Sequence, residues 1–367
     1  MIKKKIILHV GTHKTGTTAI QSMLSINSEY LKNNGVLYPS AGRFGRFGGH
    51  HNIAAQLNND KKIFKNKYGT LENLCVEIKK TNFPTVIISS ESFQCLYSKP
   101  DKLRILNNCF EECGYSTEVI IFFRDQISYM EKLYRELLKY GMDIAFEEYA
   151  EEILNYGKFI YNHAEDSEIF SFTYEDIIKG FAEVFGKKNI RCVQYTYPVE
   201  PVFLKSIGLY DLYPNLKPVN RTDLINKTLP LIKSVALEYY NRTVSTKGIP
   251  DKLKQIGRNH IVSWQVDTSV EYPVIPYLYR IKTELFIKKF ERLNINLNNN
   301  YGLELTTQHY EYGGYSKIPQ INKYNSNNDN SVSVEMLINK ALKISELSLT
   351  AAKALRKFHK LSNHFKK

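Results

Sequence analysis

The chain has 367 residues, more than one average domain needs and fewer than three. Hydrophobic residues make up 43% and charged residues 24%, an ordinary globular composition that excludes a disordered or fibrous chain. Lysine and arginine together number 50, against 37 acidic residues, which gives a net charge of +13. That excess favours anionic partners such as nucleotides, nucleic acids, acidic glycans or an anionic membrane surface, without choosing among them.

The five cysteines are odd in number and form no C-x-x-C pair and no Cys/His cluster with the spacing of a zinc site. Cys109 and Cys113 are four residues apart, and we interpret them as two thiols on one helix. This usage favours a reducing, cytoplasmic setting. No stretch approaches the roughly 20 apolar residues of a membrane-spanning helix.

The first 200 residues alternate short β-branched runs with helical stretches. Continuous apolar runs bounded by polar residues are typical of strands buried on both faces, and four such runs occur, at residues 6–10, 85–89, 119–123 and 190–195. Helix-like segments lie between them, among them 17–32 and 126–140. This alternation predicts an α/β fold with three α/β/α layers around a central parallel sheet.

The rest of the chain has a different pattern. Residues 223–297 are mostly helical in character, and Asn-rich stretches such as NINLNNNY and NKYNSNNDN follow. Asn-rich segments cannot bury apolar area and are typical of surface linkers. We therefore expect one main domain at 1–300, a linker at 301–330 and a single helix at 331–367.

The strongest local signal is the segment HVGTHKTGTTAIQSML, in which a buried strand runs into a loop with two glycines and then into a helix. The backbone N–H groups of such a loop, and the N-terminus of the helix after it, attract phosphate-like anions. Gly11 and Gly16 permit the tight turn and a close approach of the backbone. The hydroxyls of Thr15, Thr17 and Thr18 add hydrogen-bond donors.

The loop keeps the glycine spacing of the nucleotide-binding sequence G-x-x-x-x-G-K-[ST] but not its lysine. Thr17 occupies the lysine position, and the loop's own lysine is Lys14. A nucleotide kinase or NTPase built on this loop would lack its usual phosphate lysine. That class stays an alternative, recognisable by Mg²⁺-dependent ATP or GTP turnover, as does a non-catalytic protein that binds anions or glycans on the same scaffold.

A loop lysine two residues before glycine, followed by two threonines, resembles the 5′-phosphosulfate loop of sulfotransferases that use 3′-phosphoadenosine 5′-phosphosulfate (PAPS). Lys14, Thr15, Gly16, Thr17 and Thr18 match the Lys-Thr-Gly-Thr-Thr form of bacterial carbohydrate-type members position by position. The resemblance implies the P-loop-containing nucleotide-hydrolase-like fold of sulfotransferase type. It also implies PAPS as donor without a metal, and a hydroxyl acceptor on a carbohydrate or polysaccharide rather than a nucleic acid.

The family's loop lysine contacts the sulfonate and stabilises charge on the leaving phosphate. The resemblance gives Lys14 that role, and a fixed cation helps most where charge develops in the transition state. His13, its neighbour in the loop, is a candidate second donor to the sulfonate. Both residues are therefore predicted to contact the donor.

The run 119–123 ends at Arg124. Sulfotransferases place an arginine at this strand end and a serine eight residues later, and the pair binds the 3′-phosphate of PAPS. Arg124 fits that role, but the position eight residues later is Lys132, whose ammonium can neutralise a phosphate as a point charge. Ser128, one helical turn earlier, is the other candidate.

Sulfonate transfer to a hydroxyl needs a general base, usually His or Glu in this family. Glu91 follows the run 85–89, at the sheet edge where open α/β sheets bind ligands, and it is our first choice; the alternative is an acid that caps the following segment. His50 and His51 lie in the Gly- and Arg-rich stretch GRFGRFGGHHN, which either covers the acceptor or is a solvated surface loop. His51 is our second candidate, and His9 is expected in the core.

Residues 331–367 carry eight basic and two acidic side chains, with apolar residues recurring every three or four positions. Such a stripe predicts an amphipathic helix that buries one face. It can pack on the catalytic body, pair with a second copy of the chain in a homo-oligomer, or lie peripherally on an anionic membrane, for a cytoplasmic protein the inner face. The sequence leaves all three open.

Overall fold

The computed structural model describes residues 4–163, 166–219, 229–264 and 277–305, together with residues 341 and 343. The chain divides into two compact units, and the range 1–300 contributes to both of them. The first unit comprises residues 1–129, 153–226 and 286–309, and the second comprises residues 130–152, 227–285 and 310–367. The predicted linker beyond residue 305 and the predicted helix 331–367 lie outside the described residues, apart from residues 341 and 343.

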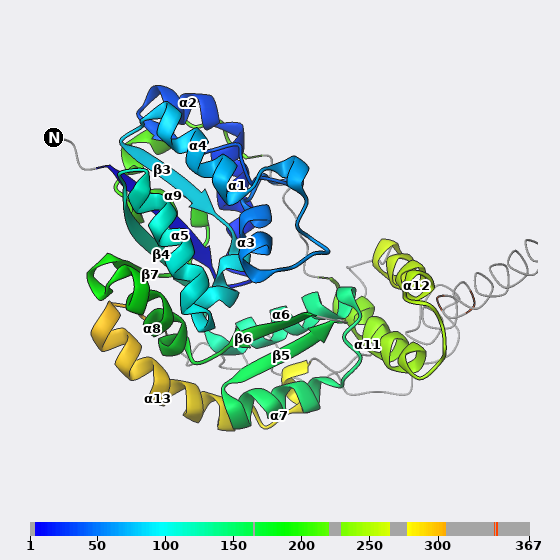
Figure 1. Cartoon of the computed structure of the whole chain (residues 1–367). Coiled ribbons are helices and arrows are strands. Elements are labelled where there is room, and N and C mark those ends of the chain that lie inside the picture. The colour runs from blue at the N-terminus through cyan, green and yellow to red at the C-terminus, as the bar shows by residue number, and fades with distance from the viewer. Residues whose placement is uncertain are drawn as a thin grey trace, which may run out of the picture. The chain divides into compact units, whose positions relative to one another are not determined.

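A five-stranded parallel sheet forms the centre of the first unit, with the strand order β2-β3-β1-β4-β7 (Figure 1). The strands are β1 (Lys5–Gly11), β2 (Val36–Leu37), β3 (Thr85–Ser89), β4 (Ser116–Phe123) and β7 (Ile190–Gln194). In the middle of the sheet, β1 pairs with β3 on one side and with β4 on the other. Because parallel neighbours end at the same edge, the loops that follow β3, β1 and β4 lie next to one another.

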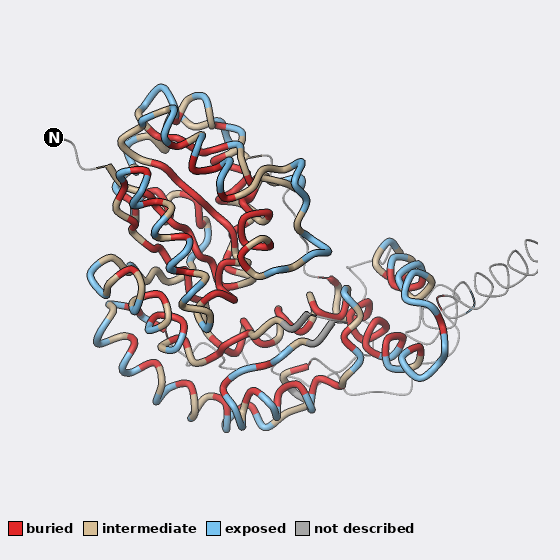
Figure 2. Tube along the Cα trace, in the orientation of Figure 1, coloured by how far each residue is buried: buried red, intermediate tan, exposed pale blue. Residues whose placement is uncertain are grey.

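Helices cover both faces of this sheet, so the predicted α/β fold with a central parallel sheet is confirmed. On one face, Ile7, Ile87 and Ile120 pack with buried residues of α1, α2 and α9. Helices α5 and α8 contact the sheet through β4, and Figure 2 shows the strands as mostly buried. The helices and 3₁₀ turns of this unit are α1 (Thr17–Ile26), α2 (Ser28–Asn33), α3 (His51–Asn58), η1 (Asn66–Tyr68), α4 (Leu71–Thr81), η2 (Glu91–Ser98), α5 (Pro100–Glu112), α8 (Tyr174–Phe185), η3 (Lys187–Asn189), α9 (Val199–Ser206) and η4 (Tyr210–Asn215).

All four predicted strands are present, and the helix predicted at 126–140 is α6 (Gln126–Tyr140). The helix predicted at 17–32 is instead two helices that meet at Asn27. The Asn27 side chain donates to the Met23 carbonyl oxygen at 2.9 Å and accepts from the Lys217 backbone N–H at 2.7 Å, so it competes with helical hydrogen bonding at that point.

Three strands were not predicted from the sequence. Strand β2 is only two residues long, too short to show a periodic pattern. Strands β5 (Lys158–His163) and β6 (Asp166–Ser171) form a separate antiparallel pair, and charged and polar residues interrupt their apolar runs. Short or interrupted runs carry little of the period-two signal on which strand prediction depends.

The second unit is mostly helical, as predicted for this part of the sequence. It contains α11 (Leu231–Ser245), α12 (Asp251–Ser263) and η5 (Tyr277–Arg280), and it shares α6, α7 (Phe146–Tyr156) and α13 (Thr283–Tyr301) with the first unit. Rings of Tyr134, Phe146 and Tyr277 pack together in its core. The Arg280 guanidinium pairs there with the buried Glu238 carboxylate at 2.8 Å, which leaves this carboxylate compensated.

The Asn-rich run NINLNNNY is helical and not a linker, because it forms the last two turns of α13. Leu297 on this run is 1% exposed and Asn294 is 2% exposed. The Asn294 amide exchanges two hydrogen bonds with the Gln126 amide, at 2.6 and 3.1 Å. One face of the run is therefore buried, with the Asn294 amide paired, while Asn296, Asn299 and Asn300 stay exposed.

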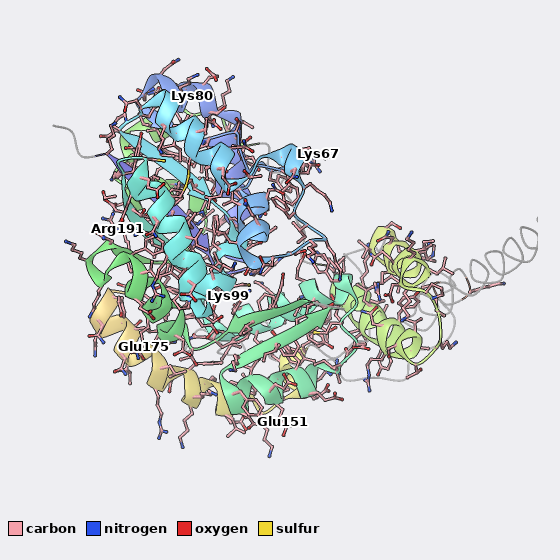
Figure 3. All side chains as sticks on the ribbon, in the orientation of Figure 1. Lys67, Lys80, Lys99, Glu151, Glu175 and Arg191 are labelled. Carbon is pink, nitrogen blue, oxygen red and sulfur yellow. A yellow bond between two sulfur atoms is a disulfide. The ribbon has the colours of Figure 1, made fainter. Side chains whose placement is uncertain are left out.

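The structure also pairs Cys75 of α4 with Cys109 of α5 in a disulfide, drawn as the yellow bond in Figure 3. Cys75 and Cys109 are 34 residues apart in sequence, and the sequence analysis had instead interpreted Cys109 as a thiol beside Cys113. Within the described stretches, no helix combines the length and the apolar character that a membrane crossing requires.

Candidate functional site

The candidate site lies where β1, β3 and β4 end side by side. The loop 12–16 follows β1, Ser90 and Glu91 follow β3, and Arg124 follows β4. The parallel register of the three strands thus brings together the predicted anion loop, the predicted base and the predicted arginine. All of them belong to the first unit.

The loop after β1 has the conformation that an anion-binding turn needs. Gly16 adopts a left-handed backbone with φ of 80° and begins α1, and no side chain caps this end of the helix. The Thr15 hydroxyl donates to the Thr12 carbonyl oxygen at 2.5 Å, so it shapes the loop, whereas we had expected it to be a donor to the anion. Thr17 and Thr18 form the first positions of α1, where backbone N–H groups lack helical partners.

Lys14 stands in the left-handed region with φ of 66°, which costs a non-glycine residue roughly 1–2 kcal/mol. Arg124 helps to hold this conformation because its Nη1 donates to the Lys14 carbonyl oxygen at 2.8 Å. Successive backbone N–H groups in such a turn point to one side and form a concavity for an anion. A strained backbone at the one lysine of the loop is typical of a functional position.

Close packing requires both glycines of the loop. A Cβ atom on Gly11 would lie 2.2 Å from the Thr17 methyl carbon, and one on Gly16 would lie 2.8 Å from a Val199 methyl carbon. Neither separation is possible between carbon atoms without a shift of the backbone or side chain. The spacing of the two glycines, which first indicated the site, therefore has a steric reason.

Both the guanidinium and the backbone carbonyl of Arg124 are held by neighbouring residues. Its guanidinium carbon lies 4.2 Å from the centre of the Tyr195 ring, in cation–π geometry. The Tyr174 hydroxyl donates to the Arg124 carbonyl oxygen at 2.6 Å. The predicted arginine is thus ordered beside the loop, and Tyr195, which the sequence analysis did not identify, belongs to the same site.

Ser128 and Lys132, the two candidate partners of Arg124, lie one turn apart on α6 and are both half-buried. The backbone N–H of Ser128 donates to the Asp125 carboxylate at 2.8 Å, which closes the first turn of this helix. Lys132 belongs to the second unit, whereas Arg124 and Ser128 belong to the first. Ser128 is therefore the candidate that shares a compact unit with the anion loop.

Glu91 and His51 form the second half of the site. Nδ1 of His51 lies 2.9 Å from the Ser90 hydroxyl and 3.8 Å from the Glu91 carboxylate. The same carboxylate oxygen accepts from the Gln21 amide at 2.9 Å. Both His51 and Glu91 keep 22% of their side chains exposed, so the pair can be reached from solvent.

The charge environment keeps Glu91 ionised. Burial by itself raises the pKa of the Glu91 carboxyl, but positive charge on His51 and His13, its own backbone N–H and the Gln21 amide outweigh burial. The pKa of Glu91 therefore lies below its ordinary value. Nδ1 of His51 hydrogen-bonds with the Ser90 hydroxyl, and the negative charge of Glu91 3.8 Å away favours a proton on Nδ1, which leaves the lone pair on Nε2.

The Gly49 backbone packs closely against that nitrogen, and only a glycine fits there. A Cβ atom at this position would lie 2.5 Å from Nε2 of His51 and 2.7 Å from the Gln21 amide carbon. The backbone of the Gly-rich stretch thus passes directly over the His51–Gln21 pair. The histidine end of this stretch therefore lies in the candidate site and is not a solvated surface loop.

His50, in contrast to His51, is a structural residue. It is fully buried, accepts from the Ser89 backbone N–H at 3.2 Å through Nδ1, and has Nε2 3.1 Å from the Pro39 carbonyl oxygen. Burial lowers the pKa of His50 to about 3. The solvated histidine that we considered for this position is therefore wrong, since a buried neutral imidazole joins α3 to β3.

His9 lies in the core, as predicted. Its Nδ1 is 2.8 Å from the Ser89 hydroxyl, and burial lowers the pKa of the imidazole to about 4. His13 does not stand out toward solvent: its ring lies 3.4 Å from the Gln94 side-chain oxygen and packs edge-on against Phe170. Gln94 thus orients His13 at the edge of the anion loop.

Gln21, Ser90, Gln94 and Tyr195 are the site residues that sequence reasoning missed. Gln21 lies on α1, four positions after Thr17, so helical spacing from the loop could have placed it on the same face. Ser90 precedes the predicted base directly. Nothing in the sequence marks Gln94 or Tyr195 as site residues, because their contacts come from segments far away in the chain.

A comparison with models of known protein families found no match, and a comparison with curated proteins found none either.

We predict that Glu91→Gln reduces the dependence of stability on acidic pH. Because the folded-state pKa is depressed, the ionised carboxylate stabilises the fold above the unfolded pKa of about 4.3, and this contribution disappears as pH falls through the folded pKa. Urea denaturation at a series of acidic pH values measures this contribution to the free energy of unfolding. The wild type should lose its advantage over Glu91→Gln across this range; parallel stability curves would contradict the assignment.

Proposed function

We propose that the protein is a sulfotransferase that transfers a sulfonate group from PAPS to a hydroxyl group, on a carbohydrate or polysaccharide. The observation that supports this most is the meeting of three adjacent strand ends. They bring a lysine-containing anion loop, a histidine–carboxylate pair and an ordered arginine to one edge of a parallel sheet. Donor, acceptor base and charge stabilisation are the three requirements of sulfonate transfer.

On the donor side, the loop 12–16 and the start of α1 bind the 5′-phosphosulfate. Their backbone N–H groups and the helix dipole favour an anion there. Lys14 contributes a fixed positive charge near the oxygen that joins phosphate to sulfonate. Arg124 contributes to binding the 3′-phosphate and steadies the Lys14 backbone, with Ser128 as its second ligand.

On the acceptor side, we assign proton abstraction to His51 and its orientation to Glu91. A carboxylate with a lowered pKa is a weak base, whereas imidazole is the side chain that most often acts as a general base. Glu91 keeps the proton of His51 at Nδ1, and Nε2 accepts the proton of the acceptor hydroxyl. Glu91 was our first choice of base, and this assignment reverses the two roles.

The chemical step then balances without a metal at this site. The acceptor oxygen forms a bond to sulfur while the bond from sulfur to the phosphate oxygen breaks. The hydroxyl proton passes to Nε2 of His51, and 3′-phosphoadenosine 5′-phosphate leaves with the bond's electron pair. Lys14 stabilises the negative charge that develops on that leaving oxygen.

The charge of the acceptor, the cellular location and the role of residues 331–367 belong to the same proposal. A net charge of +13 suits an anionic donor and an acidic glycan better than a neutral acceptor. We assign the protein to the cytoplasm, where reductants would convert the Cys75–Cys109 disulfide of the structure to two thiols. The basic helix at 331–367 is proposed to add an oligomer contact or peripheral contact with the inner membrane face.

The first test is nucleotide binding. We expect 3′-phosphoadenosine 5′-phosphate to raise the melting temperature without added metal, because it fills both the loop and the Arg124 site. At about a hundredfold excess over its dissociation constant, a ligand adds roughly 2.7 kcal/mol to the unfolding free energy. ATP with Mg²⁺ should add far less. An equal or larger shift with ATP and Mg²⁺ would instead favour the kinase or NTPase alternative.

The second test separates the roles of two cations. Lys14→Asn removes the charge but keeps a side chain that tolerates a left-handed backbone, and we expect kcat for sulfotransfer to fall at least about a hundredfold. Arg124→Ala should act chiefly on the KM for PAPS, with a smaller loss in kcat from the released Lys14 carbonyl. Near-normal turnover by Lys14→Asn would overturn the catalytic role of the loop.

The third test distinguishes the base from its partner. His51→Gln removes the base, so kcat should fall by at least about a hundredfold. Glu91→Gln leaves the imidazole in place and should lose less, with a changed pH dependence of kcat/KM. If Glu91→Gln loses more activity than His51→Gln, then Glu91 is the base. If the wild type and all variants bind the nucleotide but the wild type transfers no sulfonate, the protein is a non-catalytic binder.

A further inference from the structure

Three cysteine sulfurs converge between α4 and α5, far along the chain from the anion loop. Cys75 comes from α4, while Cys109 and Cys113 lie one helical turn apart at the end of α5. The sulfur atoms all lie within 4.8 Å of one another. Spacing of i and i+4 puts Cys109 and Cys113 on one face of α5, toward the helix that carries Cys75.

Helices α4 and α5 contact each other, and each buries apolar side chains besides its cysteines. Leu74 and Ile78 of α4, and Leu106 and Phe110 of α5, are fully buried. The Cys113 sulfur lies 3.6 Å from the Cys75 carbonyl oxygen, and the Cys75 sulfur lies 3.8 Å from the Cys109 carbonyl oxygen. Breaking the disulfide would therefore leave the three sulfurs close together.

The cluster is separate from the proposed catalytic site. β4 begins at Ser116, shortly after Cys113, whereas the anion loop and Arg124 lie at the opposite, carboxyl end of the strands. Cys75 and Cys113 are each 9% exposed, and Cys109 is half-buried, so water and small ions reach the cluster from one side. No residue of the proposed mechanism takes part in it.

We propose that Cys75, Cys109 and Cys113, once the disulfide is reduced, bind one Zn²⁺ ion through three thiolates. Zinc–sulfur bonds of about 2.3 Å in tetrahedral geometry separate the sulfurs by about 3.8 Å. The three sulfurs lie within 4.8 Å of one another, and once the Cys75–Cys109 bond is broken these two sulfurs must move apart to reach that spacing. Within the described parts of the chain, no carboxylate or imidazole completes the group. Water takes the fourth position on the exposed side of Cys109.

The change from disulfide to zinc site proceeds in two balanced steps. A dithiol reductant supplies two electrons, so its own sulfurs form a disulfide while the Cys75–Cys109 bond breaks and both sulfurs take protons. Zn²⁺ then binds the three sulfurs as thiolates and releases their protons to solvent. Lys79, one turn after Cys75 on α4, acts on Cys113 electrostatically and offsets the remaining negative charge.

The decisive experiment is a metal titration of the full-length protein after reduction with a phosphine and removal of the reductant without oxygen. Co²⁺ serves as the spectroscopic probe, because thiolate ligands give it a charge-transfer band, and Zn²⁺ should displace it at one equivalent. We expect Cys75→Ser, Cys109→Ser and Cys113→Ser each to weaken binding at least about tenfold. The matched controls Cys95→Ser and Cys192→Ser, which change free cysteines elsewhere, should bind as the wild type does.

A second measurement uses only the wild type, so its result does not depend on whether the cysteine-to-serine variants fold. Alkylation of the reduced wild type, read by mass spectrometry, should slow at Cys75, Cys109 and Cys113 when Zn²⁺ is present and stay unchanged at Cys95 and Cys192. The proposal is overturned if the reduced protein shows no thiolate–Co²⁺ band. It is equally overturned if Cys113→Ser binds as tightly as the wild type, or if the disulfide form binds Zn²⁺ equally well. None of these outcomes depends on sulfotransfer.

Discussion

The hydrogen bond from Arg124 to the carbonyl oxygen of Lys14 joins the ends of two neighbouring strands, and the candidate site depends on it. A lysine with a left-handed backbone would relax if nothing held it, because that conformation is costly for any residue with a Cβ atom. Arg124 holds the carbonyl while its guanidinium rests on Tyr195. The residue proposed to bind the 3′-phosphate therefore also shapes the loop proposed to bind the 5′-phosphosulfate.

The acceptor side shows how buried structural residues can position exposed functional ones. His50 is fully buried and holds the start of α3 to the end of β3 through the Ser89 backbone. Its neighbour His51 is consequently fixed beside Ser90 and Glu91, and the Gly49 backbone packs closely against its outer nitrogen. Two adjacent histidines thus have opposite environments, and only the half-buried His51 can be reached from solvent.

The cysteine cluster illustrates a second use of the same scaffold. Helices α4 and α5 cover the sheet and bring three sulfurs together at the end of the strands away from the loop. In the disulfide form Cys75 and Cys109 are linked, and Cys113 remains a thiol beside them. A zinc ion and a disulfide would be alternative ways to tie α4 to α5.

The sequence by itself determined the α/β alternation, the four main strands and the anion loop, because buried strands and glycine turns are encoded by adjacent residues. It also placed Glu91 and Arg124 at strand ends. Only the tertiary structure decided which of His50 and His51 is buried, and that Gln94 and Tyr195 belong to the site. Those roles, like the Cys75–Cys109 pair, arise from contacts between residues distant in the chain, and no local pattern records them.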